Sequence, residues 1–391
     1  MSVYLDHGAT TPLRAQARMA WLEAQVAANP SSVHADGQRA RRLLEDARDR
    51  VAAVAECDPI EVVFTSGGTE SINLAVKGLW WSRTDDRRAI ALPDGEHHAT
   101  MESVDWLAER EGARIAPVPI DMDARIDPDA VATVLAAGDT AFLTALVANN
   151  EVGTVNDVER IAEVAAAGNV PLHLDAVSAA GHVPLAFRSW RGSAEGHSGL
   201  VALSVSGHKL GAPVGTGALV VSRYARLAAL QHGGGQQRGL RAGTQDVAGA
   251  TALAVALECA EAERQDLARR HAALRARLLK RLAAEPGIRL LGDPERRVHA
   301  NVHLHLAGAQ GESVLYLLDL AGVSASTGSA CQAGVTEASH VVRAMGLGDE
   351  ASRQVLRLTM GSDTTESDID TAAGAILEAY RRVGPASRSR V

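Results

Sequence analysis

A lysine near the middle of this chain is the residue best suited to covalent chemistry. The apolar run from Leu200 to Val205 predicts a buried strand, and Ser206-Gly207-His208-Lys209 follows it directly. In a nearly dry pocket at the end of a strand, desolvation lowers the pKa of an amine and makes its lone pair available. Lys209 is therefore suited to form a Schiff base, although a lysine in a surface loop would look the same on its own.

A glycine-rich turn earlier in the chain could hold a phosphate. Residues 60–64 predict a strand, and Ser66-Gly67-Gly68-Thr69-Glu70 then opens a helix, where free N–H groups and the helix dipole attract an anion. The glycines could instead serve only to make the turn tight. Ser206 and His208 would reach the same phosphate. A phosphate beside Lys209 suggests pyridoxal 5′-phosphate, because the carbonyl and the anion belong to one cofactor.

Two further positions suit this cofactor. Its ring nitrogen needs a carboxylate, because a protonated pyridinium stabilises a carbanion. Asp175 ends the apolar strand predicted over residues 171–174 and could supply that carboxylate, or it could cap a following helix. A flat group over the ring is also expected, and His97 or His98 fits, unless the two are an ordinary surface pair.

The chain has three cysteines, Cys57, Cys259 and Cys331, and their odd number and wide spacing argue against disulfides or a metal site. Cys57 and Cys259 resemble ordinary buried thiols. Cys331 ends Ser326-Thr327-Gly328-Ser329-Ala330-Cys331, a run of small residues that predicts a mobile loop. A thiol reached by solvent is unusual, so Cys331 is the candidate nucleophile, the alternative being a chance cysteine in a flexible segment.

The elements that would position these residues alternate between strands and helices. Apolar strands are predicted at residues 89–92, 141–148 and 171–174, each followed by a polar cluster. This alternation predicts an α/β protein with a mainly parallel sheet covered by helices. In such sheets ligands bind beyond the carboxyl ends of the strands, where all of these clusters lie.

The character of the sequence changes near residue 260. Leucines on one face predict a long helix over residues 258–285, and Pro286-Gly287 ends it. Residues 301–306 alternate like a half-exposed strand, residues 312–320 predict a helix, and residues 355–358 predict another strand. The expected parts are an N-terminal arm at 1–12 that packs with the small domain, a large cofactor-binding domain at 13–258, a small α+β domain at 259–380 that carries the Cys331 loop, and a disordered tail at 381–391.

Composition restricts the partners of this protein. The formal net charge of −8 gives no basic surface for nucleic acid or an anionic membrane. The N-terminus lacks the pattern of a signal peptide, and no run approaches the roughly twenty apolar residues of a membrane span. We therefore expect a cytoplasmic protein that uses neither nucleic acid nor membrane and holds no metal.

The order of these motifs resembles that of the cysteine desulfurases, pyridoxal-phosphate enzymes of the class-V aminotransferase type. These enzymes supply sulfur for iron–sulfur clusters, thiolated tRNA and sulfur-containing cofactors. The match covers nearly the whole chain. Its motifs are Tyr4-Leu5-Asp6-His7-Gly8-Ala9-Thr10-Thr11-Pro12, Asn29-Pro30-Ser31-Ser32-Val33-His34, Phe64-Thr65-Ser66-Gly67-Gly68-Thr69-Glu70-Ser71, Glu96-His97-His98, Asn149-Asn150-Glu151-Val152-Gly153, Ser206-Gly207-His208-Lys209, Arg241-Ala242-Gly243-Thr244 and Ser326 to Cys331.

The resemblance implies a fold and an activity. The fold is type I of the pyridoxal-phosphate enzymes, with a mainly parallel seven-stranded sheet, in a homodimer. The activity converts L-cysteine to L-alanine and places the sulfur on Cys331 as a persulfide, for delivery to an acceptor protein. Selenocysteine lyase, another C–S lyase or an aminotransferase of the same fold stay open as alternatives, as does, less favoured, an inactive sulfur-relay scaffold.

The resemblance also implies a role for each site residue. Lys209 would hold the cofactor and later move protons, His97 would stack on the ring and help to deprotonate the substrate thiol, and Cys331 would attack the substrate sulfur. The implied contacts are Asp175 at the ring nitrogen, Gly68, Thr69, Ser206 and His208 at the phosphate together with Thr244 of the second subunit, and Asn150 and Arg357 at the substrate carboxylate.

The chain departs from the family pattern at three positions. Ser178 stands where the family commonly has a glutamine that hydrogen-bonds the 3′ oxygen of the cofactor, so a changed cofactor environment is expected. Ala242 replaces a common serine, and Gly8 replaces a common alanine or serine. Neither of these removes a group that the reaction requires, and together the changes indicate a specialised paralogue.

Overall fold

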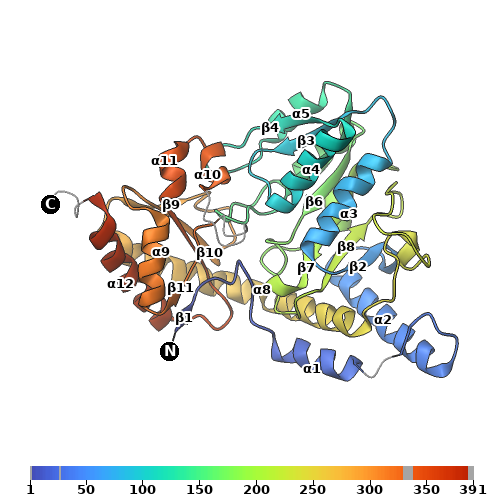
Figure 1. Ribbon diagram of the computed structural model, residues 1–391, viewed down its shortest axis with the longest axis horizontal. Coiled ribbons are helices and arrows are strands. Elements are labelled where there is room, and N and C mark those ends of the chain that lie inside the picture. The colour runs from blue at the N-terminus through green and yellow to red at the C-terminus, as the bar shows by residue number, and fades with distance from the viewer. Residues whose placement is uncertain (1, 26–27, 329–337, 386–391) are drawn as a thin grey trace.

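A seven-stranded sheet is the centre of the larger part of the molecule. The computed structural model describes residues 2–25, 28–328 and 338–385 (Figure 1). The strand order is β2-β8-β7-β6-β5-β3-β4, and β8 runs antiparallel to both of its neighbours while the other pairs are parallel. The strands are β2 (Val62–Thr65), β3 (Ala89–Pro93), β4 (Arg114–Val118), β5 (Thr140–Leu146), β6 (Pro171–Asp175), β7 (Gly199–Ser206) and β8 (Gly217–Val221). The predicted mainly parallel α/β sheet is confirmed.

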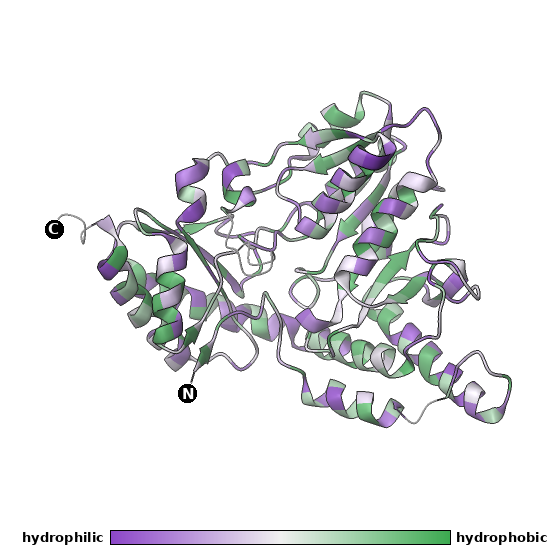
Figure 2. Cartoon of the chain, in the orientation of Figure 1, coloured by the Kyte–Doolittle hydropathy of each residue, from purple (hydrophilic) through white to green (hydrophobic). Residues whose placement is uncertain are grey.

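Helices cover both faces of this sheet. Strands β5, β6 and β7 are buried along their whole length, which explains why they read as continuous apolar runs. Helices α3 (Gly68–Trp81) and α4 (His98–Glu111) pack on one face. The other face is covered by α2 (Ala35–Val54), α5 (Pro128–Leu135), α6 (Val158–Ala167), α7 (Phe187–Arg191) and the first half of α8 (Val247–Leu282). Figure 2 shows apolar residues concentrated on the strands and on the helix sides that face them.

The 36-residue helix α8 joins the two parts of the chain (Figure 1). Asp246 caps its start by accepting a hydrogen bond from the N–H of Gly249 at 2.8 Å. The sequence predicted a start near residue 258, which is about three turns too late. Residues 247–257 are almost uniformly small and apolar because they are buried against α1 (Ala15–Ala24) and α2, so they show no amphipathic period. The expected boundary at residue 258 therefore falls inside one continuous helix.

The smaller part contains, in its described residues, an antiparallel sheet of order β12-β10-β9 and four helices. Its elements are β9 (Ile288–Leu291), β10 (Asn301–Leu306), α9 (Gly311–Leu320), β11 (Val323–Ser324), α10 (His340–Ala344), α11 (Gly348–Arg353), β12 (Val355–Thr359) and α12 (Glu366–Val383). The prediction of a half-exposed strand over residues 301–306 was wrong, because β10 is the central strand and all six of its residues are buried. The expected tail at 381–391 was also wrong in part: α12 continues to Val383, and residues 386–391 lie outside the described part.

The N-terminal arm crosses from one part of the molecule to the other. Strand β1 (Val3–Tyr4) pairs in parallel with β11, and Asp6 forms a bridge with Thr359 at the end of β12. The N–H of Thr11 then donates to the carbonyl of His208 at 2.9 Å, in the larger part. The remaining elements are three short 3₁₀ turns, η1 (Pro59–Glu61), η2 (Gly207–Lys209) and η3 (Gln237–Gly239). In the described part of the chain, no helix is both long enough and apolar enough to cross a membrane.

Candidate functional site

A cavity of about 90 Å³ lies where the larger part, the N-terminal arm and helix α8 meet. Asn150, Ser178 and Lys209 line it from segments that follow β5, β6 and β7. His7 and Gly8 line it from the arm. These sequence-predicted residues therefore meet beyond the carboxyl ends of neighbouring parallel strands, as expected for an α/β sheet.

Lys209 ends the 3₁₀ turn η2 directly after β7. Its Nζ donates to the carbonyl of Gly8 and, at 3.1 Å, to the carbonyl of Ala9. The turn leaves no room for a side chain at Gly207, because a Cβ there would lie 2.2 Å from Oγ1 of Thr216. The amine is thus held at the edge of the cavity by two carbonyls of the N-terminal arm.

Asp175 is 1% exposed at the end of β6. Its Oδ1 accepts a hydrogen bond from the N–H of Val177 at 2.8 Å, in a turn that no helix follows until α7, so the helix-cap alternative is wrong. Burial raises the pKa of Asp175 to about 6, against the opposing effects of this hydrogen bond and of Lys209. A cation beside this carboxyl would keep it ionised, and the nitrogen of a pyridinium ring provides such a charge.

The glycine-rich turn presents a helix N-terminus to a buried hydroxyl. Gly67 precedes α3 with a φ of +148°, a conformation that favours glycine, and α3 begins at Gly68. The backbone approaches Ser206 closely, since a Cβ at Gly68 would lie 3.3 Å from Cβ of Ser206. The buried Oγ of Ser206 has no hydrogen-bond partner, although such groups are normally paired. The unpaired hydroxyl and the helix N-terminus together fit a phosphate.

The remaining predicted phosphate contacts are less enclosed. Thr69 is exposed in the first turn of α3. His208 is half-buried, and burial together with the charge of Lys209 lowers its pKa to about 4, so its ring is neutral near pH 7. Thr244 is exposed and does not line the cavity beside Lys209 in its own chain.

His97 and His98 occupy different environments at the start of α4. His97 is the N-cap residue of this helix, and its Nδ1 accepts a hydrogen bond from the N–H of Ala99 at 3.1 Å. The pKa of His97 is lowered to about 4, mainly by burial and then by Lys209. The ring of His98 instead packs edge-on against His340, with 4.8 Å between the ring centroids. His97 caps the helix, whereas His98 contacts another histidine.

Arg357, from β12 of the smaller part, meets Asn150 from the larger part. Its Nη1 donates to the carbonyl of Asn150 at 3.2 Å and to that of Gly328 at 3.3 Å, while Nη2 contacts Oδ1 of Asp6 at 3.3 Å. Nε of Arg357 is buried without a partner, and so is Oδ1 of Asn150. Nε and Nη2 of an arginine point the same way, so this edge suits the two oxygens of a carboxylate.

The candidate nucleophile Cys331 lies outside the described residues. The chain leading to it is well defined, because Ser326 exchanges two backbone hydrogen bonds with Arg357, at 3.0 and 2.6 Å. Cys57 is buried, and burial raises the pKa of its thiol to about 12. Cys259 is half-buried in α8. Cys57 therefore does not resemble an activated thiol.

Sequence reasoning missed three carboxyl groups around this site, of which Glu96 and Glu151 are buried and Asp6 is half-buried. Glu96 is fully buried, and its Oε1 accepts a hydrogen bond from the N–H of Leu146 at 2.8 Å. Glu151 accepts a hydrogen bond from the hydroxyl of Ser339, and Asp6 pairs with Arg357. Each belongs to a motif that the sequence displayed, but nothing local indicated which long-range partner it would meet.

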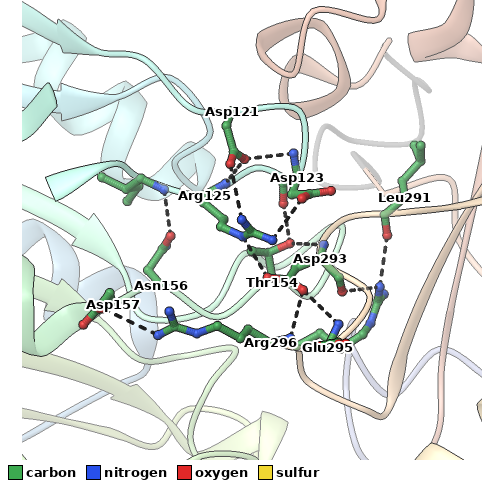
Figure 3. A network of polar contacts seen from close by, with 12 residues as sticks. Asp121, Asp123, Arg125, Thr154, Asn156, Asp157, Leu291, Asp293, Glu295 and Arg296 are labelled. Carbon is green, nitrogen blue, oxygen red and sulfur yellow. Dashed lines mark hydrogen bonds and ion pairs between the residues drawn. The ribbon is translucent and has the colours of Figure 1, made fainter. Parts of the chain in front are cut away.

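A polar network fixes the segment that carries Asn150 to the smaller part (Figure 3). Asp293 accepts hydrogen bonds from Nε of Arg125 at 2.8 Å and from two backbone N–H groups, while its own N–H donates to Thr154 at 3.0 Å. Asn156 accepts from the N–H of Ile126 at 2.9 Å. Across residues 2–25, 28–328 and 338–385, no three or more His, Cys, Asp or Glu side chains lie together so that they could hold a metal ion.

The chain is similar in sequence and in structure to known proteins. The family model "Aminotransferase class-V" matches residues 3–371. An IscS-like cysteine desulfurase of Mycobacterium tuberculosis is 42% identical, covering 97% of this chain and 97% of the relative. The cysteine desulfurase IscS of Methanosarcina thermophila is 35% identical, covering 98% and 93%. A solved NifS-like protein superposes with a TM-score of 0.87 at 28% identity, covering 97% and 99%.

Proposed function

Because the chain belongs to the class-V aminotransferase family and, within it, to the cysteine desulfurases, we propose that it converts L-cysteine to L-alanine with pyridoxal 5′-phosphate as cofactor. The sulfur passes to Cys331 as a persulfide. The observation that carries the proposal is the meeting of Arg357 with Asn150 across the two parts of the chain, beside the cavity that Lys209 lines. An amino-acid substrate requires a carboxylate-binding group near an amine, and this contact supports Arg357 and Lys209 in those two roles.

The cofactor is held by residues of strands β6 and β7, helix α3 and the 3₁₀ turn η2. Gly68, Thr69, Ser206 and His208 hold the phosphate, and Asp175 pairs with the ring nitrogen. Support comes from the unpartnered hydroxyl of Ser206 and the buried carboxyl of Asp175. When bound, pyridoxal phosphate supplies an aldehyde for covalent attachment and a ring that withdraws electrons from Cα of the substrate.

The residues of the chain then act in sequence. Nε and Nη2 of Arg357 bind the substrate carboxylate, assisted by the amide of Asn150. Lys209, the residue that would hold the cofactor, would take the proton from Cα of the substrate. His97 would stack on the ring and help to deprotonate the substrate thiol. Ser178, which lines the cavity with Lys209 and Asn150, would stand where the family commonly has a glutamine for the 3′ oxygen.

Sulfur transfer to Cys331 balances without a further oxidant. The thiolate of Cys331 attacks the substrate sulfur, so an S–S bond forms while the bond from sulfur to Cβ breaks. Both electrons of that bond stay on the carbon side, where Cβ takes a proton. One L-cysteine and one thiol thus give one L-alanine and one persulfide.

We also propose the setting in which the enzyme works. It acts in the cytoplasm as a homodimer, in which the exposed Thr244 of one subunit contacts the phosphate of the other. An acceptor protein takes the sulfur from Cys331, for iron–sulfur cluster assembly, tRNA thiolation or a sulfur-containing metabolite.

The test compares two cysteine variants of the holoenzyme. Cys331→Ala should abolish alanine formation and dithiothreitol-dependent sulfide release while the visible absorbance of the bound cofactor is unchanged, because the cofactor site does not use this thiol. Cys259→Ala is the matched control and should keep full activity. Alanine formation that survives in Cys331→Ala overturns the persulfide route and favours a C–S lyase or selenocysteine lyase of the same fold; a keto-acid product favours an aminotransferase.

A further inference from the structure

The loop that carries Thr244 is attached to the glycine-rich turn of its own chain. We call residues 236–246 the Thr244 loop. Nε of Arg241, in this loop, donates to Oε1 of Glu70 at 3.0 Å, and Oε2 of Glu70 accepts a hydrogen bond from the N–H of Ser66 at 2.7 Å. Glu70 lies in the first turn of α3, whose N-terminus is proposed to hold the phosphate. The two oxygens of one carboxylate therefore connect the glycine-rich turn to the Thr244 loop.

A second contact holds the Thr244 loop against strand β2, which lies at the edge of the large sheet. The side-chain amide of Gln237 accepts from the N–H of Phe64 and donates to its carbonyl, both at 2.7 Å, so it pairs with this edge as a neighbouring strand would. Gln236 accepts a hydrogen bond from the N–H of Gly243 at 3.0 Å. This contact closes the loop on itself at the residue before Thr244.

The backbone of the Thr244 loop is strained and depends on such contacts. Gln237 and Arg238 have φ values of +50° and +60°, in the left-handed region that non-glycine residues rarely adopt. Such a conformation costs free energy and persists only where the surrounding structure holds it. Nη1 of Arg238 adds hydrogen bonds to the carbonyls of Ile60 at 3.2 Å and Val221 at 2.9 Å. The position of Thr244 therefore depends on the segments against which the loop rests.

We propose that the ion pair between Glu70 and Arg241 couples the two phosphate sites of the homodimer, so that cofactor bound in one subunit raises the affinity of the other. The inference rests on the proposed function, in which Thr244 of one subunit contacts the phosphate of the other. An anion at the N-terminus of α3 stabilises the turn that carries Glu70, and Glu70 holds the Thr244 loop through Arg241. Because each subunit both provides and receives a Thr244, the coupling is reciprocal.

The environment of the ion pair suits this role. Both side chains are half-buried, so solvent and salt screen the pair less than they screen a pair on the surface. Burial opposes the ionisation of Glu70, but hydrogen bonds with Ser66 and Arg241 outweigh it and lower the pKa of this carboxyl. The carboxylate is therefore ionised near pH 7 and accepts hydrogen bonds from the glycine-rich turn and from the Thr244 loop at the same time.

Titration of the cofactor-free dimer with pyridoxal phosphate tests the coupling without turnover. The visible absorbance of the bound cofactor gives the isotherm, from which two successive dissociation constants are fitted. The parent protein should bind the second cofactor at least about fivefold more tightly than the first, which is the lower end of typical coupling. Arg241→Gln removes the ion pair and should give two sites of equal affinity. Arg238→Gln is the matched control, because it makes the same change in the same loop away from Glu70, and it should keep the fivefold difference.

Three results would overturn the proposal. They are equal affinities at the two sites of the parent dimer, a fivefold difference that persists in Arg241→Gln, and loss of the difference in both variants, which would assign the coupling to the loop as a whole. These outcomes are separate from a failure of the proposed function. Cooperative binding of the cofactor without formation of alanine from L-cysteine would refute the proposed reaction and support the coupling, whereas an active dimer with independent sites would refute the coupling alone.

Discussion

Oδ1 of Asp6 lies 3.3 Å from Nη2 of Arg357, so the N-terminal arm contacts the arginine proposed to bind the substrate carboxylate. The side chain of Arg357 is 6% exposed and that of Asp6 is 20% exposed. In the described part of the chain, Asp6 is the only carboxylate in an ion pair with Arg357. The same arm holds Lys209 through the carbonyls of Gly8 and Ala9. A short terminal segment thus contacts both Arg357 and Lys209, which are proposed to bind the substrate carboxylate and to move the Cα proton.

Asp6→Ala should raise the KM for L-cysteine about tenfold with kcat nearly unchanged, a loss of about 1.4 kcal/mol of substrate binding. Removing this partner frees the guanidinium to turn away from the orientation that binds a carboxylate. Asp6→Asn keeps a hydrogen-bond acceptor at the same position and should recover most of the affinity. Steady-state kinetics on both variants check this, and a KM in Asp6→Ala equal to that of the parent enzyme would show that Asp6 does not position Arg357.

Gly8 allows the arm to pass close to Thr359. A Cβ at position 8 would lie 2.9 Å from Cγ2 of Thr359, while the N–H of Gly8 donates to Oγ1 of Thr359 at 2.6 Å. Gly8→Ala should therefore cost about 1–3 kcal/mol through overpacking and expose the arm to proteolysis. Adding Thr359→Ser removes Cγ2 but keeps the hydroxyl acceptor, so the double variant should recover stability. Thermal unfolding and limited proteolysis measure both effects; a double variant no more stable than Gly8→Ala would refute the steric explanation.

Glu96 predicts a pH-dependent stability. Burial raises its pKa from the ordinary 4.5 to about 8, helped by the charge of Asp175 and opposed by the hydrogen bond from Leu146. The folded protein then binds a proton that the unfolded chain releases above about pH 4.5, so this group stabilises the fold at low pH and loses that contribution as the pH rises to about 8. Glu96→Gln mimics the protonated acid at every pH.

The melting temperature of Glu96→Gln should accordingly match that of the parent protein near pH 5 and exceed it increasingly toward pH 8, with no further gain above. Each pair of melts is recorded in the same buffer, so other titrating groups cancel. A difference that does not change with pH would mean that Glu96 is ionised in the folded protein at all of these pH values.

The network of Figure 3 predicts unequal effects from two partners of one ion pair. The side chain of Asp293 is 3% exposed and also accepts from two backbone N–H groups, whereas Arg125 is 43% exposed. Asp293→Ala should cost about 2–4 kcal/mol because it leaves buried donors unpaired. Arg125→Ala should cost about 1 kcal/mol or less, as expected for an exposed charge. Denaturant unfolding of the two variants gives the comparison, and the reverse order would be incompatible with this network.

Much of the site could be predicted from sequence because its residues follow strands directly. Asp175 and Lys209 each come within a few residues of the end of an apolar run, and the carboxyl ends of parallel strands meet at one edge. The local pattern therefore placed both residues near one another without any contact information. The glycine-rich turn before α3 was predictable for the same reason.

Other features depended on tertiary contacts that no local pattern carries. Asp6 and Arg357 are separated by nearly the whole chain, and the arm contains no signal for its partner. His97 and His98 are neighbours in sequence but have different surroundings, because His97 caps α4 and the ring of His98 packs against His340. Strand β10 alternates in sequence but is central in its sheet, so its polar His303 and His305 are buried as well.

The persulfide on Cys331 is the claim on which the account depends most. Peptide mass spectrometry of the holoenzyme after one equivalent of L-cysteine should find the mass of one added sulfur atom on the peptide that contains Cys331, and none on the peptides of Cys57, whose pKa burial raises to about 12, or Cys259. Alanine produced with an unmodified Cys331, or with the added sulfur on another cysteine, would contradict it.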